Sequence, residues 1–310
     1  MPASAEIKLL SVSRESQVET RFDSELGAYW ACMSPRPRPC FNLQLLGDLN
    51  GYIESIKVND GKVVAGGREQ KVSYGILASS TPGIFNLGGD LALFRMLIHT
   101  QNHESLVDYG KRCVANLLAW HRNCDGLITS IALVQGDALG GGFEAALSAS
   151  VLIAEESSRL GFPEILFNLF PGMGAFSFLS RKIGRRAAED LITSGTIYSA
   201  RQLYDMGVID VLTPDGTGQA AVEAYIRRHS KNLNGRQGFE RARNEVAPIT
   251  EHELIRVVEI WADTALKLQE RDLKVMDRLI RAQARAAEQL FPNVGANVVP
   301  MHAVAVGGCD

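Results

Sequence analysis

The stretch from Ala138 to Leu147 reads ALGGGFEAAL and decides how the middle of this chain folds. The apolar segment SIALVQG precedes it and predicts a buried strand, while the residues after the glycines predict an amphipathic helix. Glycine lets the backbone approach a ligand closely, and the first amides of a helix lack partners within it. This arrangement predicts a site for negative charge. Glu144 follows one turn into the helix, which favours chemistry on a carbonyl over phosphate binding.

Two further segments extend this pattern. A second glycine turn, FNLGGDL, lies upstream from Phe85 to Leu91, and GFPEILFNLFPGMG, from Gly161 to Gly174, carries Glu164 downstream. In this order the three segments resemble the enoyl-CoA hydratase/isomerase (crotonase) superfamily, between about Lys71 and Pro214. Each segment alone would be a weak signal, and the resemblance rests on their combination.

The resemblance implies a role for four residues. The backbone amides of Gly89 and Gly141 would hold the oxygen of a thioester enolate, and Glu144 and Glu164 would move protons at its α and β carbons. An apolar setting, such as the residues around Glu164, raises a carboxyl pKa and suits a proton shuttle. The alternatives are glycine turns without a catalytic role, a Glu144 that only complements the helix dipole, and a surface Glu164. Asp90 is expected to cap the helix that follows it.

The chain is predicted to be an α/β protein, because strand, turn, helix and strand repeat along it. With the resemblance, this becomes a spiral core of repeated ββα units over residues 1–234, a helical C-terminal region used in oligomerisation over 235–290, and a loose tail over 291–310. Residues 250–289 contain no Pro or Gly. The apolar residues at helical spacing there form one stripe: Leu254, Val258, Trp261, Ala265 and Leu268.

Several longer sequence segments resemble a narrower family, the bacterial diffusible-signal-factor synthases. They include RPCFN from Arg38, IFNLGGDLALF from Ile84 and VMDRLIRAQ from Val275. This resemblance implies a dehydratase and thioesterase that converts 3-hydroxyacyl-acyl carrier protein to a free cis-2-unsaturated fatty acid signal, with no cofactor or metal. The resemblance to the crotonase superfamily implies a homotrimer or a dimer of trimers, and a regulatory sensor protein is a possible further partner. The segment SPRPRPCFN replaces the part that helps to bind coenzyme A in the superfamily, which favours a carrier protein over acyl-CoA.

Two sets of residues are candidates for contacts with such a substrate. Leu139, Phe143 and Trp261 would line an acyl pocket, with core or trimer packing as the alternative for Trp261. Carrier proteins are acidic, so we expect a basic docking patch on this protein. The candidate residues are clustered on one predicted helix, and the alternative is that they are simply the solvated end of that helix. They are Arg181, Lys182, Arg185 and Arg186.

Composition excludes several other classes of protein. The formal net charge of −3 gives no electrostatic support for a nucleic-acid partner, and no apolar run is long enough for a membrane span. The N-terminus lacks a secretory pattern and the five cysteines form no CxxC, so we expect a reduced, cytoplasmic protein. No serine-hydrolase, P-loop or Rossmann motif occurs. Two alternatives to the synthase remain: an enoyl-CoA hydratase acting on trans-2-enoyl-CoA, and a crotonase-fold protein that acts mainly by binding another protein.

Overall fold

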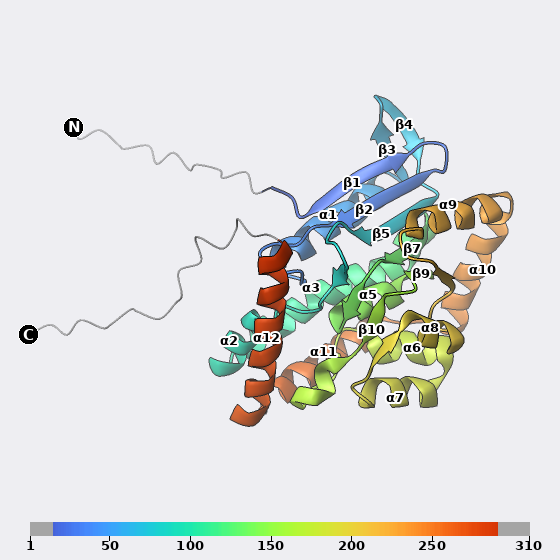
Figure 1. Cartoon of the computed structure of the whole chain (residues 1–310). Helices are drawn as coiled ribbons and strands as arrows, with labels where there is room; N and C mark the ends of the chain where they lie inside the picture. Colours follow the sequence, from blue (N-terminus) through green and yellow to red (C-terminus); the bar gives the residue numbers. More distant parts are fainter. Residues whose placement is uncertain (1–14, 291–310) are drawn as a thin grey trace, which may run out of the picture.

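The computed structural model describes residues 15–290, which form a larger and a smaller sheet surrounded by helices (Figure 1). The predicted tail at 291–310 lies outside the described residues. The larger sheet has six strands, and all its neighbouring pairs are parallel except the first, β1–β2. In spatial order its strands are β1 (Val18–Asp23), β2 (Ala28–Met33), β5 (Tyr74–Ser79), β7 (Thr129–Val134), β9 (Val151–Glu155) and β12 (Val211–Thr213).

A second sheet of four short strands lies beside the first. Its spatial order is β11 (Ile197–Ser199), β10 (Arg159–Gly161), β8 (Asp137–Leu139) and β6 (Ile84–Asn86). The chain alternates between the sheets, because β5 leads to β6, β7 to β8 and β9 to β10. A helix follows each of the first two pairs before the chain returns to the larger sheet, so the predicted spiral of ββα units is confirmed.

Helices cover both faces of the larger sheet. The long helices are α1 (Leu43–Val58), α2 (Leu91–His99), α3 (His103–His121), α5 (Gly141–Ser148), α6 (Ala175–Ile183), α7 (Arg185–Thr193), α8 (Ala200–Asp205), α9 (Gly218–His229), α10 (Leu233–Val246), α11 (Glu251–Ala265) and α12 (Glu270–Leu290). The short elements are the hairpin β3 (Lys62–Ala65) and β4 (Arg68–Lys71), α4 (Asn123–Gly126), η1 (Pro163–Phe167) and η2 (Ser230–Asn232). No helix in the described part of the chain is long and apolar enough to span a membrane.

The central strands are buried on both faces, as their continuous apolar sequences predict. All six residues of β7 and all five of β9 are buried. One apolar core fills the side of α1, α3, α5 and the C-terminal helices, and a smaller core lies under α9 on the other face. The strands are thereby held rigidly enough to position the turns that follow them.

The C-terminal region forms two helices after α10 rather than one continuous rod. Every residue of the predicted stripe is buried, from Leu254 to Leu268. However, α11 ends at Ala265 and α12 begins at Glu270, where the Asp272 carboxylate accepts a hydrogen bond from the Gln269 amide at 2.9 Å. An N3 carboxylate that accepts from the N-cap amide is half of a capping box, which favours the start of a new helix at this point.

Candidate active site

Two glycine turns meet at one edge of the smaller sheet. Because β6 and β8 are parallel neighbours, the turns at Gly88–Gly89 and Gly140–Gly141 leave the sheet side by side. A Cβ on Gly88 would lie only 2.8 Å from the Leu139 carbonyl oxygen and 3.1 Å from the Gly141 nitrogen. Only glycine therefore allows the two backbones to approach this closely.

The amides of Gly89 and Gly141 are both available to a ligand. Neither nitrogen donates a hydrogen bond to any group within residues 15–290, and both residues line one cavity. The neighbouring amide of Gly88 is satisfied by the Asn86 side chain at 2.8 Å, which fixes the first turn. Two adjacent amides without partners, one of them at the N-terminus of α5, form a suitable holder for a developing oxyanion.

Glu144 lies on the first turn of α5 and is 1% exposed. Its Oε1 atom accepts hydrogen bonds from the Met173 amide at 2.8 Å and from the Ala175 amide at 3.0 Å. Burial raises the pKa of the Glu144 carboxyl to about 7, while the two amides act in the opposite direction. Both protonation states are therefore accessible near neutral pH.

Glu164 lies on η1 and faces the same cavity. Its Oε1 atom lies only 2.3 Å from the position that a Cβ on Gly140 would take, so the carboxylate rests on the backbone of the second glycine turn. The Oε2 atom is buried and has no hydrogen-bond partner among the described residues. Burial, and secondarily the charge of Glu144, raise the pKa of Glu164 to about 8.

These four residues line one apolar cavity that opens to the surface. Gly89, Gly141 and Glu164 are partly exposed there, whereas the residues of α1 and α3 at its inner end are buried. The remaining lining residues are mostly apolar: Phe41, Leu46, Leu49, Tyr52, Ile53, Leu77, Leu91, Phe94, Tyr109, Cys113, Asn116, Leu117, Trp120, Ala145, Ser148, Phe167, Leu169, Pro171, Gly172, Met173 and Trp261. Such a cavity suits an acyl chain whose carbonyl stays at the mouth.

The residues expected to line the acyl pocket are only partly found there. Trp261 lines the cavity, and it also packs edge to face against Phe94 at 5.1 Å. Leu139 and Phe143 are not among the lining residues, and Phe143 instead stacks on Phe162 at 4.8 Å inside the core. Phe143 and Glu144 are neighbours on α5, but successive residues of a helix point in different directions, so only Glu144 reaches the cavity.

The main walls of the cavity come from α1 and α3, which sequence reasoning did not assign to the site. Tyr109, Cys113, Asn116 and Trp120 are spaced by three or four residues along α3 and share one face. Trp120 lies seven residues beyond Cys113, or roughly 10 Å along the helix. This spacing was a signal in the sequence, but it could equally have indicated ordinary core packing.

A polar pair interrupts the inner end of the cavity. The side-chain amide nitrogen of Asn116 donates a hydrogen bond to the Leu46 carbonyl at 3.0 Å. The side-chain oxygen of Asn116 is buried and has no partner among the described residues. The indole nitrogen of Trp120, one turn further on, is likewise buried and without a partner. One acceptor and one donor are therefore buried without partners on two residues that line the cavity.

Asp90 caps α2, as expected. Its carboxylate accepts from the Leu93 amide at 3.2 Å and from the Arg38 guanidinium at 2.8 Å. The segment containing Arg38 is also bound to the first glycine turn, because the Leu87 amide donates to the Pro39 carbonyl and the Phe41 amide donates to the Gly88 carbonyl, both at 2.8 Å. The Pro-rich segment between β2 and α1 is thus part of the wall beside the oxyanion turn.

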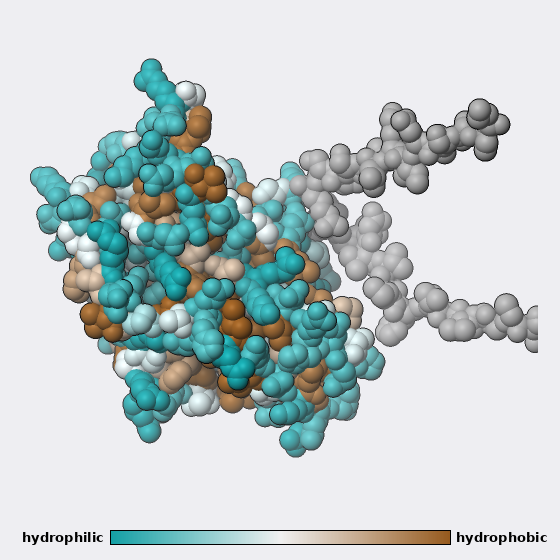
Figure 2. Space-filling view, turned by 180° about the vertical axis from the view of Figure 1, so that it is seen from behind, coloured by the Kyte–Doolittle hydropathy of each residue, from teal (hydrophilic) through white to brown (hydrophobic). Residues whose placement is uncertain are grey.

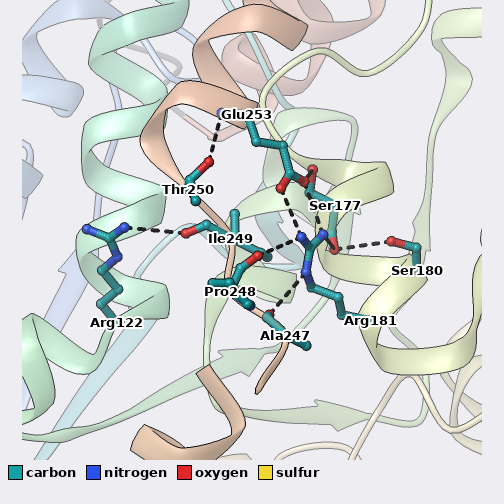
Figure 3. A network of polar contacts seen from close by, with 9 residues as sticks. All are labelled: Arg122, Ser177, Ser180, Arg181, Ala247, Pro248, Ile249, Thr250 and Glu253. Carbon is teal, nitrogen blue, oxygen red and sulfur yellow. Dashed lines mark hydrogen bonds and ion pairs between the residues drawn. The ribbon is translucent and has the colours of Figure 1, made fainter. Parts of the chain in front are cut away.

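The expected basic docking patch is largely occupied by internal contacts. Figure 3 shows the Arg181 guanidinium between the Glu253 carboxylate, at 2.9 Å, and the backbone carbonyls of Ala247 and Pro248, at 3.2 and 2.7 Å. Arg181, on α6, therefore binds the segment at Ala247 and Pro248 that precedes α11. Lys182 pairs with Asp210 at 2.8 Å and Arg186 with Asp190 at 3.0 Å, which leaves Arg185 as the member of the cluster without an ion pair among the described residues.

The spiral of ββα units, with two glycine turns at one edge, defines a crotonase-fold protein. The sequence pattern of the enoyl-CoA hydratase/isomerase family matches residues 64–273, and the chain belongs to this family. Its members are enzymes, and the family includes hydratases and isomerases.

Curated relatives match parts of the chain. The enoyl-CoA isomerase/hydratase fer4 of Mycosarcoma maydis is 42% identical over 91 residues, which cover 29% of this chain and 33% of that protein. The peroxisomal bifunctional enzyme of Danio rerio is 38% identical over 107 residues, which cover 34% of this chain and 15% of that protein. The chain thus spans a third or less of these two relatives. A probable enoyl-CoA hydratase of Rhizobium meliloti is 27% identical over 72% of this chain and 79% of its own length.

Solved structures share the fold at low sequence identity. An enoyl-CoA hydratase from Bacillus halodurans superposes with a TM-score of 0.69 at 19% identity, over 86% of this chain and all of that chain. Human mitochondrial delta3-delta2-enoyl-CoA isomerase superposes with a TM-score of 0.64 at 15% identity, over 89% of this chain and 97% of that chain. At these identities the likeness concerns the fold alone.

Proposed function

We propose that this protein dehydrates a 3-hydroxyacyl thioester on acyl carrier protein and then hydrolyses the thioester, which releases a free cis-2-unsaturated fatty acid of the diffusible-signal-factor class. One observation carries this proposal: two buried carboxyls with raised pKa values share a cavity with two backbone amides that have no partners. This arrangement suits the addition or removal of water next to a carbonyl. The narrower substrate class rests on the resemblance described above.

In the dehydration, one glutamate takes the proton from the α-carbon while the Gly89 and Gly141 amides hold the enolate oxygen. The other glutamate gives its proton to the hydroxyl on the β-carbon, and the C–O bond breaks to release water. The electron pair of the enolate becomes the new double bond. Glu144 and Glu164 are both suited to either role, because burial places both pKa values near neutrality.

In the hydrolysis, a glutamate takes a proton from water as the water oxygen attacks the carbonyl held by the same two amides. The tetrahedral intermediate then collapses, the C–S bond breaks, and the leaving thiolate receives a proton. Support comes from Glu164, whose Oε2 atom has no partner within the described residues and is free to bind a water molecule.

The second candidate is an enoyl-CoA hydratase that adds water to trans-2-enoyl-CoA. The relatives from Mycosarcoma maydis, an enoyl-CoA isomerase/hydratase, and from Rhizobium meliloti, a probable enoyl-CoA hydratase, favour it. The same glutamates and amides would act in the reverse direction, and no free acid would form. The two candidates therefore differ in product and in carrier.

Incubation of the protein with 3-hydroxydodecanoyl carrier protein separates these candidates. We expect free cis-2-dodecenoic acid by mass spectrometry, and little hydration of trans-2-dodecenoyl-CoA at the same enzyme concentration. Rapid hydration of the CoA ester, with no free acid from the carrier-bound substrate, would instead support the enoyl-CoA hydratase.

The rate of dehydration is expected to follow a bell-shaped pH profile. The glutamate that acts as base must be ionised, so kcat/KM rises as the pH rises through about 7. The glutamate that acts as acid must be protonated, so kcat/KM falls as the pH rises through about 8. The two values belong to the interacting pair rather than to assigned roles. Steady-state rates across this range test the prediction, and a flat profile around neutrality would contradict it.

Enlarging the inner end of the cavity is expected to shift the preference toward longer acyl chains. Ile53 lines the cavity beside Tyr52, so Ile53→Ala should favour chains longer by about one or two carbons, at a stability cost of roughly 2–5 kcal/mol. Ile56→Ala is the matched control, because Ile56 lies on the same helix and is fully buried but does not line the cavity. Competition between chain lengths measures the preference. An equal shift in both variants would refute the assignment.

We also propose that α10 contributes to an oligomer interface. Only Glu240 is buried within α10, while Phe239 and Val246 are 70% and 86% exposed. A helix with so little contact to its own subunit is suited to cover a second copy of the chain. Phe239→Glu should lower the particle mass measured by light scattering. Val64→Glu, a change at a 76% exposed residue of β3, should not, and equal masses for both variants would argue against the proposal.

A further inference from the structure

The last helix, α12, carries a regular row of basic side chains. All five are exposed and recur at intervals of three and four residues, so they share one face of the helix. We call this row the basic stripe: Arg271, Lys274, Arg278, Arg281 and Arg285. It spans 15 residues, and its ends are roughly 21 Å apart along the helix axis.

The opposite face of α12 attaches the helix to the body of the protein. Leu273, Met276 and Gln283 are buried on that face. The basic stripe therefore points away from the body, and Figure 1 shows α12 lying along the outside of the molecule, beside α2. In contrast, the far side in Figure 2 mixes hydrophilic and hydrophobic residues around a central hydrophobic patch.

Contacts on the buried face of α12 place this helix beside the elements that carry the active site. Near its N-terminus, the Asp272 carboxylate accepts from the Asn168 amide at 3.3 Å, and Asn168 immediately follows the η1 helix of Glu164. Near its other end, the Gln283 amide donates to the Leu87 carbonyl at 3.0 Å, next to the first glycine turn. A partner bound along the stripe would therefore lie across α12 from both halves of the catalytic site.

Four of the five side chains in the basic stripe form no ion pair within the described residues, although Asp277 and Glu288 lie three or four positions from stripe residues on the same helix. Lys274, Arg278, Arg281 and Arg285 have no ion pair or hydrogen bond with another residue in the 15–290 range, and Arg271 contacts only Asp272. The acidic residues Glu270 and Asp277 on the same helix face Arg95 of α2 instead, at 3.7 and 3.4 Å.

We infer that the basic stripe is the docking surface for the acidic carrier protein that presents the acyl thioester. This inference rests on the proposed function. A straight row of exposed cations matches an extended acidic surface, such as a helix with carboxylates at the same spacing, and guides its approach over a distance set by salt screening. The Arg181 cluster cannot do this equally well, since three of its four charges are paired within the protein.

The test compares two quadruple charge reversals in the full chain. The stripe variant combines Lys274→Glu, Arg278→Glu, Arg281→Glu and Arg285→Glu. The control variant combines Lys231→Glu, Arg112→Glu, Arg185→Glu and Arg228→Glu, which are also exposed and have no ion pair among the described residues. Both sets contain one lysine and three arginines and alter the net charge equally.

Binding of a bacterial holo acyl carrier protein without an acyl group is measured first, at low and at physiological salt. We expect the stripe variant to bind about tenfold or more weakly, and the control variant to bind like the wild type. Turnover of 3-hydroxydodecanoyl carrier protein should show the same rise in KM with little change in kcat. Turnover of the neutral N-acetylcysteamine thioester of the same acid should be unchanged in both variants.

Equal carrier binding by the stripe variant and the wild type would overturn the docking assignment, as would equal losses in the two variants. A stripe variant that also loses activity on the N-acetylcysteamine thioester would show that α12 supports the site itself, which also overturns it. If the stripe governs carrier binding but no cis-2-enoic acid forms, the docking surface stands and the proposed reaction fails. If the acid forms equally with the stripe reversed, the reaction stands and the docking surface fails.

Discussion

Glu144→Gln and Glu164→Gln are each expected to lower kcat for dehydration by about 10²- to 10⁴-fold, the usual contribution of a positioned acid or base. Glutamine preserves the shape of both side chains but cannot exchange a proton. In Glu144→Gln the amide oxygen can still accept from the Met173 and Ala175 amides, so the fold should be retained. Single-turnover rates with 3-hydroxydodecanoyl carrier protein, followed by mass spectrometry, measure the effect.

Glu240→Gln is the matched control, because Glu240 is also a buried glutamate but lies outside the cavity, against Asn123 at 2.9 Å. Its activity should remain close to that of the wild type. The substitutions also separate the two reactions: a variant that accumulates cis-2-enoyl carrier protein identifies the glutamate needed for hydrolysis. Two glutamine variants with rates within a few-fold of the wild type would disprove the proposed chemistry.

Replacing the backbone amide of Gly141 with an ester is expected to reduce kcat by about 10²- to 10³-fold, or roughly 2.7–4 kcal/mol of transition-state stabilisation. The substitution, made by incorporating the α-hydroxy acid in place of glycine, deletes one N–H group and adds no side chain. A side chain would confuse the result, because a Cβ on Gly141 would lie 3.5 Å from the Gly89 nitrogen, within the same site. The same ester at Gly89 should have a similar effect.

An ester at Gly142 provides the control for this experiment. Gly142 belongs to the same turn and begins the same helix, but it does not line the cavity. Its ester should therefore share any general cost to the helix while leaving kcat nearly unchanged. Equal losses from the esters at Gly141 and Gly142 would indicate damage to the turn rather than the loss of an oxyanion donor.

Local sequence was sufficient to bring the central residues of the site together. Short turns fix the positions of three site residues. Gly89 lies just after β6, and Gly141 and Glu144 lie in the first turn of α5, just after β8. Parallel pairing of β6 with β8 then places the two turns side by side. The fold class was predicted for the same reason, because alternating strands and helices leave few ways to arrange a parallel sheet.

The walls of the cavity and the docking surface could not be predicted in this way. Phe143 is close to Glu144 in sequence, but the helical turn between them directs Phe143 to Phe162 in the core. The sequence also does not show which basic side chains lack an ion pair. Arg181, for example, is paired with Glu253, which is 72 residues away. Such pairings depend on the packing of distant helices, so sequence clustering overestimated the availability of those charges.

The contact between Gly140 and Glu164 links two positions that are far apart in the sequence. The Glu164 Oε1 atom occupies the space next to Gly140 where any other residue would carry a Cβ, at 2.3 Å, and Gly140 also has a positive φ of 52°. A related protein with a side chain at the position of Gly140 must therefore have the carboxylate of Glu164 displaced, or a shorter residue in place of Glu164. The two sites should accordingly covary across related proteins: those that retain the glutamate should retain this glycine, and loss of the glycine should accompany a change in the reaction catalysed.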